Sequence, residues 1–253
     1  MRAVCLVSDA AGYTAVGERL SAQALHDLAN RYYGALLAPI DAQKGIVTDI
    51  VGDSALALWP APRGGLAARH RACRAAQGIQ AAVSAFEVPG GGRLPTRIGL
   101  CVGELVLGPV GAGAHFEYRA IGDVVNTASR IEALNKHLGT QVLATAEVVD
   151  GLPGIECRPV GRFVLPGKTG ALELVELTVP IDARRAAARP LFEKALAACA
   201  AGDAGLARRA FDAVLVVDPA DTVARFYLGV LEQGDKLRQD GAVLMTGKSW
   251  AGP

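Results

Sequence analysis

The apolar and polar positions of this chain open with a short extended run and continue with a helical one. The run AVCLVSD (residues 3–9) is mostly apolar and predicts a strand that ends at Asp9. Apolar residues then recur at helical spacing from Leu25 to Ile40, which predicts a long helix with Ser21 as its N-cap. The pattern therefore predicts a strand followed by an amphipathic helix.

Two hairpin patterns follow. The stretch TDIVGDSALALW (residues 48–59) reads as two strands that turn at Gly52-Asp53, because glycine supplies the unusual φ of a tight hairpin and aspartate tolerates the next position. Turn chemistry alone is thus a sufficient explanation for an aspartate at this tip. A second pattern of this kind, TRIGLCVGELVLG, covers residues 96–108.

The remaining elements complete an alternation of strands and helices. An Ala-rich helix is expected over residues 63–86, and another over 123–139 with an aspartate cap and a glycine stop. Three further strands are expected at 140–145, 157–165 and 171–179. Helices packed on one face of a mainly antiparallel sheet are the natural architecture, so we predict an α+β, ferredoxin-like sandwich.

The chain changes character after Pro180, so we predict a first domain over residues 1–180 and a helical tail over 181–253. The tail begins with a charged, Ala-rich linker at 181–190 and continues as helices with breaks at Gly202 and Pro219. Its pattern is typical of a single tetratricopeptide-type (TPR-like) repeat. One repeat cannot bury its own face, so the tail should dock on the main domain or on a partner protein. The alternative is a plain helical hairpin.

Composition and charge exclude several classes of protein. The formal net charge is +1, which gives no electrostatic case for nucleic acid or for an anionic membrane surface. The five cysteines and four histidines are scattered without zinc or redox spacing. No apolar run approaches the roughly 20 residues that span a bilayer, and the N-terminal run is too short for a signal peptide. We expect a cytoplasmic protein.

Chemistry-bearing side chains stand at a few places in this pattern. Asp9 ends the first strand, and Asp53 stands at the hairpin tip. If their strands are neighbours, the two carboxylates suit Mg²⁺ or Mn²⁺, which one or two carboxylates and substrate phosphates normally hold. The turn after Asp9 offers backbone N–H groups where a helix begins, so Gly12, Tyr13 and Thr14 are candidates for binding phosphate.

Asn126 and Arg130 are four residues apart on the predicted helix over 123–139, so they share one face. From there Arg130 is a candidate for clamping a phosphoryl group, and its alternative is an ordinary surface arginine. Glu132 and Lys136 on the same helix fit an intrahelical ion pair and receive no further role.

Four motifs together carry a resemblance to a known family. They are SDAAGYTAVGERL, GIVTDIVGDSALALW, RIGLCVGELVLGPVG and YRAIGDVVNTASRIE. In order and spacing, the chain over about residues 3–180 resembles the class III nucleotide cyclases, the adenylate and guanylate cyclase catalytic domains. The motif sequences are similar to those of bacterial members whose cyclase domain follows a membrane-anchored sensor. No such sensor is visible, so a detached domain and a fragment both remain open.

The resemblance implies roles for individual residues. It implies that two Mg²⁺ or Mn²⁺ ions per site fall on Asp9 and Asp53, where they activate the ribose 3′-hydroxyl and neutralise the triphosphate. It implies that Asn126 orients the ribose and that Arg130 stabilises the transition state. Lys168, in the segment LPGKTG, matches the family's phosphate-binding lysine. Members of the family work as dimers with shared sites, which implies that this chain forms a homodimer and that a monomer is inactive.

The base-reading positions depart from the family. Asp49 stands where adenylate-forming members carry a lysine, and Arg119 stands where they carry an acid or a threonine. This charge-swapped pair still offers one acceptor and one donor, which suits adenine or guanine. Guanylate cyclases carry an acid at the position of Asp49. A third alternative is that Asp49 and Arg119 simply pair with each other.

We therefore predict an adenylate cyclase, a phosphorus-oxygen lyase that converts ATP to cyclic AMP and pyrophosphate. The alternatives are a guanylate or mixed-specificity cyclase that takes GTP, and a non-catalytic cyclase-fold module that signals through its tail. The presence of both aspartates and of the pair at 126 and 130 favours the enzyme, because a binding module needs no transition-state residues. The altered base-reading pair favours the module.

Overall fold

The chain forms two compact units. The computed structural model describes residues 1–62, 65–112, 115–177, 183–234 and 236–245. The first unit comprises Met1–Asn135 with Gln141–Ile155, and the second comprises Lys136–Thr140 with Glu156–Pro253. This grouping by compactness differs from the domain boundary predicted after residue 180, which stays a prediction. None of the described helices is both long and apolar enough to span a bilayer.

The first unit is built on a mainly antiparallel sheet in the order β7-β4-β1-β3-β2. The central strand β1 pairs in antiparallel fashion with β3 and β4, β2 pairs with β3, and β7 runs parallel to β4. The strands are β1 (Arg2–Ala10), β2 (Ile46–Val51), β3 (Ser54–Pro60), β4 (Thr96–Glu104) and β7 (Val142–Thr145). The mixed α+β class predicted from the sequence is confirmed.

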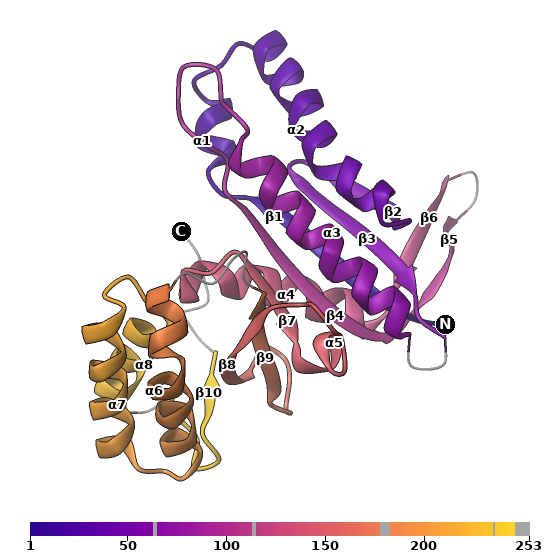
Figure 1. The fold of residues 1–253 in the computed structure, drawn as a ribbon. Coiled ribbons are helices and arrows are strands. Elements are labelled where there is room, and N and C mark those ends of the chain that lie inside the picture. The colour runs from indigo at the N-terminus through magenta and orange to yellow at the C-terminus, as the bar shows by residue number, and fades with distance from the viewer. Residues whose placement is uncertain (63–64, 113–114, 178–182, 235, 246–253) are drawn as a thin grey trace. The chain divides into compact units, whose positions relative to one another are not determined.

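Two long helices cover one face of this sheet. Helix α3 packs across β1, β3 and β4, and α2 packs against α3 (Figure 1). Ser21 caps α2 by accepting a hydrogen bond from the backbone N–H of Ala24 at 3.2 Å, as the sequence predicts. The helices are α1 (Tyr13–Gly17), α2 (Ala22–Ala42), α3 (Leu66–Ser84), α4 (Asp123–Leu138) and α5 (Ala146–Val149). The buried residues of α2 follow the predicted periodicity and are Leu28, Tyr32, Leu36 and Ile40.

Helix α4 lies on the opposite face of β4. The side chain of Thr96 shares a 2.9 Å hydrogen bond with Tyr32 of α2. Gly99 is three residues further along β4, so it faces the opposite side of the sheet from Thr96. A Cβ atom at Gly99 would stand 2.2 Å from the carbonyl oxygen of Ala128 in α4. Alternate strand residues point to opposite faces, so α2 and α4 sandwich β4. The sequence predicted helices on one face only, and the glycine in β4 is what admits α4 to the other.

The segment after β4 forms a separate hairpin of β5 (Val106–Ala112) and β6 (His115–Ile121). The sequence predicted a hairpin within 96–108, which is wrong because β4 stays paired with β1 as far as Glu104. Several large apolar side chains of the β5–β6 hairpin are exposed to solvent: Val106, Val110, Phe116, Tyr118 and Ile121. An apolar surface of this kind is typical of an interaction site.

In its described residues, the second unit joins three strands to three helices. Strand β8 pairs antiparallel with β9 and parallel with β10. The elements are β8 (Cys157–Val164), β9 (Leu172–Leu177), α6 (Ala183–Ala200), α7 (Ala204–Val217), α8 (Thr222–Gln233) and β10 (Ala242–Leu244). The linker predicted over 181–190 is wrong from Ala183 onward, where α6 begins, and its first two residues lie outside the described ones. The same is true of the end of the strand predicted at 171–179.

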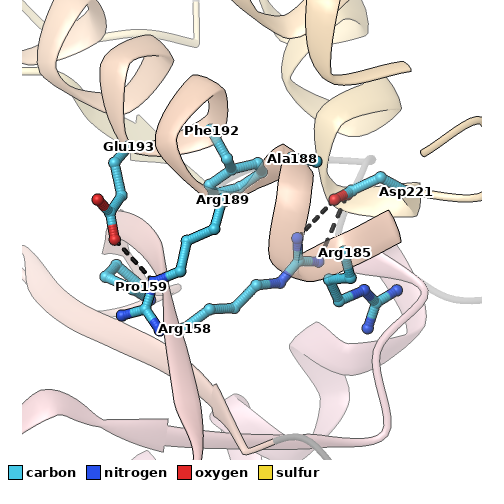
Figure 2. A pocket seen from close by; sticks show the side chains of 8 residues that line it. All are labelled: Arg158, Pro159, Arg185, Ala188, Arg189, Phe192, Glu193 and Asp221. Atoms are coloured by element: carbon cyan, nitrogen blue, oxygen red, sulfur yellow. Dashed lines mark hydrogen bonds and ion pairs between the residues drawn. The ribbon is translucent and has the colours of Figure 1, made fainter. Parts of the chain in front are cut away.

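A buried ion cluster ties the helices of the second unit to its strands. Arg158 of β8 donates to Glu176 of β9 at 2.7 Å. It also donates to Asp221 at the start of α8, as Figure 2 shows. Its side chain is only 6% exposed, and its guanidinium lies 4.8 Å from the centre of the Phe192 ring of α6. The adjoining cavity of about 10 Å³ is at the lower limit for one water molecule. We therefore regard the cluster as structural.

Candidate functional site

The two aspartates singled out in the sequence lie side by side where neighbouring strands of the first unit's sheet end. Asp9 is the last residue but one of β1, and Asp53 stands in the turn between β2 and β3, where Gly52 has a φ of 61°. Strands β1 and β3 are neighbours, as the sequence argument required. The backbone N–H of Ala10 donates to Oδ2 of Asp53 at 3.1 Å, which fixes this carboxylate beside the end of β1.

The negative charge of this carboxylate pair is incompletely compensated by neighbouring groups. Burial raises the pKa of Asp53, and the neighbouring charge of Asp9 raises that pKa further. Asp9 is better compensated, since it accepts from Ser54 at 3.1 Å and from Arg97 at 2.6 Å. Two like charges this close favour a bound cation.

Arg97 and Glu132 extend the cluster, and the sequence analysis missed both as members. Arg97 stands on β4 directly opposite Asp9 in the strand register. Its Nε atom lies 3.1 Å from Oε1 of Glu132 on α4. Burial, with a smaller contribution from the charge of Asp9, raises the pKa of Glu132 to about 7. The expectation of a plain intrahelical pair between Glu132 and Lys136 is therefore wrong.

The donor set at these strand ends fits a hard divalent cation. Carboxylate oxygens are the ligands that Mg²⁺ and Mn²⁺ prefer, and such ions are normally held by one or two carboxylates plus substrate phosphates. Within the part of the chain that the structure describes, no group of three or more His, Cys, Asp or Glu side chains is arranged to hold a metal. The assignment of Asp9 and Asp53 as metal ligands stays a prediction.

Asn126 and Arg130 lie on a different face of α4 from the carboxylate cluster. Asn126 is exposed and Arg130 is partly exposed, whereas Glu132 on the same helix is buried against β4. Two residues along an α-helix correspond to a turn of about 200°, so Arg130 points away from the cluster that Glu132 joins. Among the described residues, no hydrogen bond or ion pair links Asn126 or Arg130 to the two aspartates.

The predicted phosphate-binding residues fall in both units. Gly12, with a φ of 83°, precedes the short helix α1, and its successors Tyr13 and Thr14 begin that helix. Burial raises the pKa of Tyr13, and so does the charge of Asp53. Lys168 lies in the second unit, in a turn in which its backbone N–H donates to Leu165 at 2.9 Å. The phosphate-binding roles stay predictions.

The two predicted base-reading side chains are in contact. An oxygen of Asp49 on β2 lies 3.4 Å from a guanidinium nitrogen of Arg119 on β6, and Arg119 also pairs with Glu117 at 2.8 Å. This arrangement is the third alternative that the sequence left open. Asp49 and Arg119 remain partly exposed, so the pair contributes little to stability and separates at small cost.

Residues 2–177 match the family model described as the adenylate and guanylate cyclase catalytic domain. Adenylate cyclase 1 of Rhizobium meliloti (strain 1021) is 32% identical over 177 residues, which cover 68% of this chain and 27% of that protein. An adenylate cyclase of Anabaena cylindrica is 29% identical over 188 residues, which cover 70% of this chain and 36% of that protein. The chain thus spans less than half the length of either relative.

Two solved structures have a similar fold. The guanylate cyclase domain of RhGC from Catenaria anguillulae, in complex with GTP, matches with a TM-score of 0.60 and 22% identity over 70% of this chain and 96% of that one. The adenylyl cyclase CyaB from P. aeruginosa matches with a TM-score of 0.60 and 23% identity over 71% of this chain and 95% of that one. At these identities the likeness concerns the fold alone.

Proposed function

The chain belongs to the adenylate and guanylate cyclase family, and from that premise we propose that it is an adenylate cyclase that converts ATP to 3′,5′-cyclic AMP and pyrophosphate. Relatives named adenylate cyclase support ATP as the substrate. The observation that carries the proposal of catalysis is the approach of Asp9 and Asp53 at neighbouring strand ends, with their negative charge incompletely compensated.

Class III cyclases generally use divalent metal ions, and the carboxylates of Asp9 and Asp53 are the residues that would hold them here. Two Mg²⁺ or Mn²⁺ ions per site would supply Lewis acidity at the ribose 3′-hydroxyl and the triphosphate. Ser54 and the backbone N–H of Ala10 keep the two carboxylates oriented for this purpose.

The remaining steps belong to side chains and backbone groups of the protein. Asn126 orients the ribose so that its 3′-oxygen attacks the α-phosphorus, and Arg130 stabilises the charge that develops on the phosphoryl oxygens. Pyrophosphate leaves as the bond breaks between the α-phosphorus and the oxygen that bridges it to the β-phosphate, and the proton of the 3′-hydroxyl passes to water. The backbone N–H groups at Gly12, Tyr13 and Thr14 and the side chain of Lys168 bind phosphate.

We propose that the active unit is a homodimer with shared sites. Asn126 and Arg130 lie on the face of α4 away from the aspartates of their own chain, so they are placed to serve the aspartates of a second copy. The exposed apolar side chains of the β5–β6 hairpin offer a surface that a second copy would cover. A two-fold dimer of this kind holds two equivalent sites.

Mixing two inactive variants tests the shared site. Asp9→Ala and Arg130→Ala proteins should each be inactive alone, and the mixture should regain about a quarter of the wild-type rate, because half of the randomly formed dimers hold one whole site of two. Product formation is measured after the chains have been allowed to exchange. A mixture of Asp9→Ala with Asp53→Ala is the control, since neither hybrid site is whole. Equal silence of both mixtures would overturn the shared-site model.

The base that the enzyme reads follows from Asp49 and Arg119. Nucleotide binding separates the ion pair between Asp49 and Arg119. Asp49 then accepts a hydrogen bond from the adenine amine, and Arg119 donates one to a ring nitrogen. The same two groups complement guanine through its imino proton and carbonyl, so a guanylate or mixed-specificity cyclase is the second candidate. The closed pair also supports a third, a non-catalytic module in which base reading is lost.

Direct detection of the product decides among these candidates. The purified chain is supplied with ATP or GTP, first with Mn²⁺ and then with Mg²⁺, at several protein concentrations, and the cyclic nucleotide is measured by mass spectrometry. We expect cyclic AMP, with a rate that rises more steeply than the protein concentration because the dimer is the active species. Cyclic GMP alone would reassign Asp49 as a guanine reader. Silence of a folded dimer with both nucleotides would favour the non-catalytic module.

A further inference from the structure

Arg97 occupies the position between two carboxylates that come from different elements. One terminal nitrogen of its guanidinium lies 2.6 Å from Asp9 on β1, and its Nε atom lies 3.1 Å from Glu132 on α4. The Arg97 side chain is 20% exposed. In the absence of a metal ion, this guanidinium is the cation that compensates the charge of Asp9.

The backbone fixes Glu132 beside this arginine. Gly99 shares a strand face with Arg97, and a Cβ atom at Gly99 would stand 2.3 Å from the backbone nitrogen of Glu132. Only a glycine allows α4 to approach β4 so closely. One turn further along, the side-chain amide of Asn135 donates to the carbonyl of Ile98 at 3.0 Å. The separation of Glu132 from Arg97 is therefore set by main-chain packing and does not depend on flexible side chains alone.

The contact between Glu132 and Arg97 is close but incompletely formed. Glu132 has a side chain only 10% exposed. Neither its Oε1 atom nor Nε of Arg97 has an aligned hydrogen-bond partner among the described residues. Burial and the charge of Asp9 raise the pKa of Glu132 to about 7, although Arg97 acts in the opposite direction. Glu132 is thus a buried acceptor with unused capacity for positive charge.

We propose that Glu132 is a positioning residue: when a divalent cation occupies Asp9 and Asp53, the guanidinium of Arg97 leaves Asp9 and pairs with Glu132. This inference rests on the metal site of the proposed function. A divalent cation and a guanidinium repel each other, so both cannot use the same carboxylate of Asp9 at full strength. A small rotation of the guanidinium aligns it with Glu132, which then carries the displaced charge.

The exchange has a consequence for metal affinity. Without Glu132 as an acceptor, Arg97 stays on Asp9 and competes with the metal ion. If Glu132 had only a structural role, it would change the metal affinity only through its own negative charge. That change in affinity would be the same with or without Arg97. The coupling between residues 97 and 132 therefore separates the two roles.

Measurement of Mn²⁺ binding without nucleotide tests the exchange. Binding is monitored as the loss of the free-ion signal in electron paramagnetic resonance. Glu132→Gln should weaken Mn²⁺ binding about tenfold in the wild-type background and no more than about twofold in an Arg97→Gln background. The matched control is Glu104→Gln, an exposed acid at the far end of the same strand, which should leave binding unchanged. An equal loss in both backgrounds, or no loss in either, would overturn the proposal.

Two further variants keep the test decisive. Glu132→Asp retains the charge and shortens the reach, so it should weaken Mn²⁺ binding nearly as much as Glu132→Gln, and wild-type affinity in this variant would contradict the exchange. Asp53→Ala should abolish Mn²⁺ binding. If Asp53→Ala binds Mn²⁺ normally, the metal site of the proposed function fails and this inference fails with it. If only the Glu132 variants bind normally, the proposed function stands and this inference alone is wrong.

Discussion

Replacement of Asp53 by alanine should lower cyclic nucleotide formation about a thousandfold, since the loss of a proposed metal ligand removes several kcal/mol of transition-state stabilisation. The fold should survive. The raised pKa of Asp53 means that its ionised form is disfavoured in the folded chain, so its removal relieves repulsion with Asp9. The cost is the lost acceptor for the N–H of Ala10, about 1 kcal/mol. Product assays and urea unfolding of the same preparation measure both effects.

Asp27 provides the matched control for this replacement. It is an aspartate on α2 whose side chain is 63% exposed, so Asp27→Ala should change neither the rate nor the free energy of unfolding appreciably. An Asp53→Ala protein with more than about a tenth of the wild-type rate would remove Asp53 from the proposed metal site. An unfolded Asp53→Ala protein would show that the hairpin tip depends on this carboxylate for its structure.

The second large effect concerns stability and not chemistry. Arg158→Met should lower the free energy of unfolding by about 3–5 kcal/mol, because it leaves buried carboxylates without their main cation. Asp221 is fully buried and loses its guanidinium partner, although it still accepts a hydrogen bond from the backbone N–H of Ala224 at 2.9 Å. Glu176 retains a 3.6 Å contact with Arg185. Methionine preserves most of the apolar packing on Phe192. Urea unfolding followed by circular dichroism measures the change.

Arg208→Met supplies the comparison. Arg208 pairs with Glu232 at 3.4 Å on the surface of the same unit, where the two side chains are 43% and 66% exposed. Such a pair contributes about 0–1 kcal/mol, so this variant should unfold almost like the wild type. Similar losses for both variants would show that the effect comes from shortening an arginine in general. A negligible loss for Arg158→Met would show that the buried ion cluster contributes nothing net to stability.

Local patterns predicted the first unit well where short-range physics decides. The period of α2, its Ser21 cap and the turn at Gly52 all follow from residues within a few positions of one another. The β5–β6 hairpin was misplaced because the choice of partner for residues 106–112 depends on β1 already occupying β4. The linker failed for another reason. Alanine and arginine favour helix, but the charged, Ala-rich composition of this segment was interpreted as a linker, whereas α6 runs through it with Pro190 inside.

The candidate site divides in the same way. Asp9 and Asp53 are recognisable because each stands at a strand end or turn in a distinctive motif. Arg97 and Glu132 carry no such local mark, since one reads as an ordinary strand residue and the other as half of an intrahelical pair. Only the register that sets Arg97 opposite Asp9, and the close approach of α4 at Gly99, bring them together. Those are long-range facts that no window of sequence contains.

The parallel pairing of β10 with β8 has a consequence for synthesis on the ribosome. Leu244 of β10 aligns with Val164 of β8, so the partner of this strand is translated roughly 80 residues later. Because translation proceeds at about 5–20 residues per second, one edge of β8 stays unpaired for several seconds until β10 has been synthesised. During that interval the nascent chain presents an open strand edge to other chains. Chaperone demand during translation should therefore centre on this strand, and a tail that is made slowly would prolong the exposure.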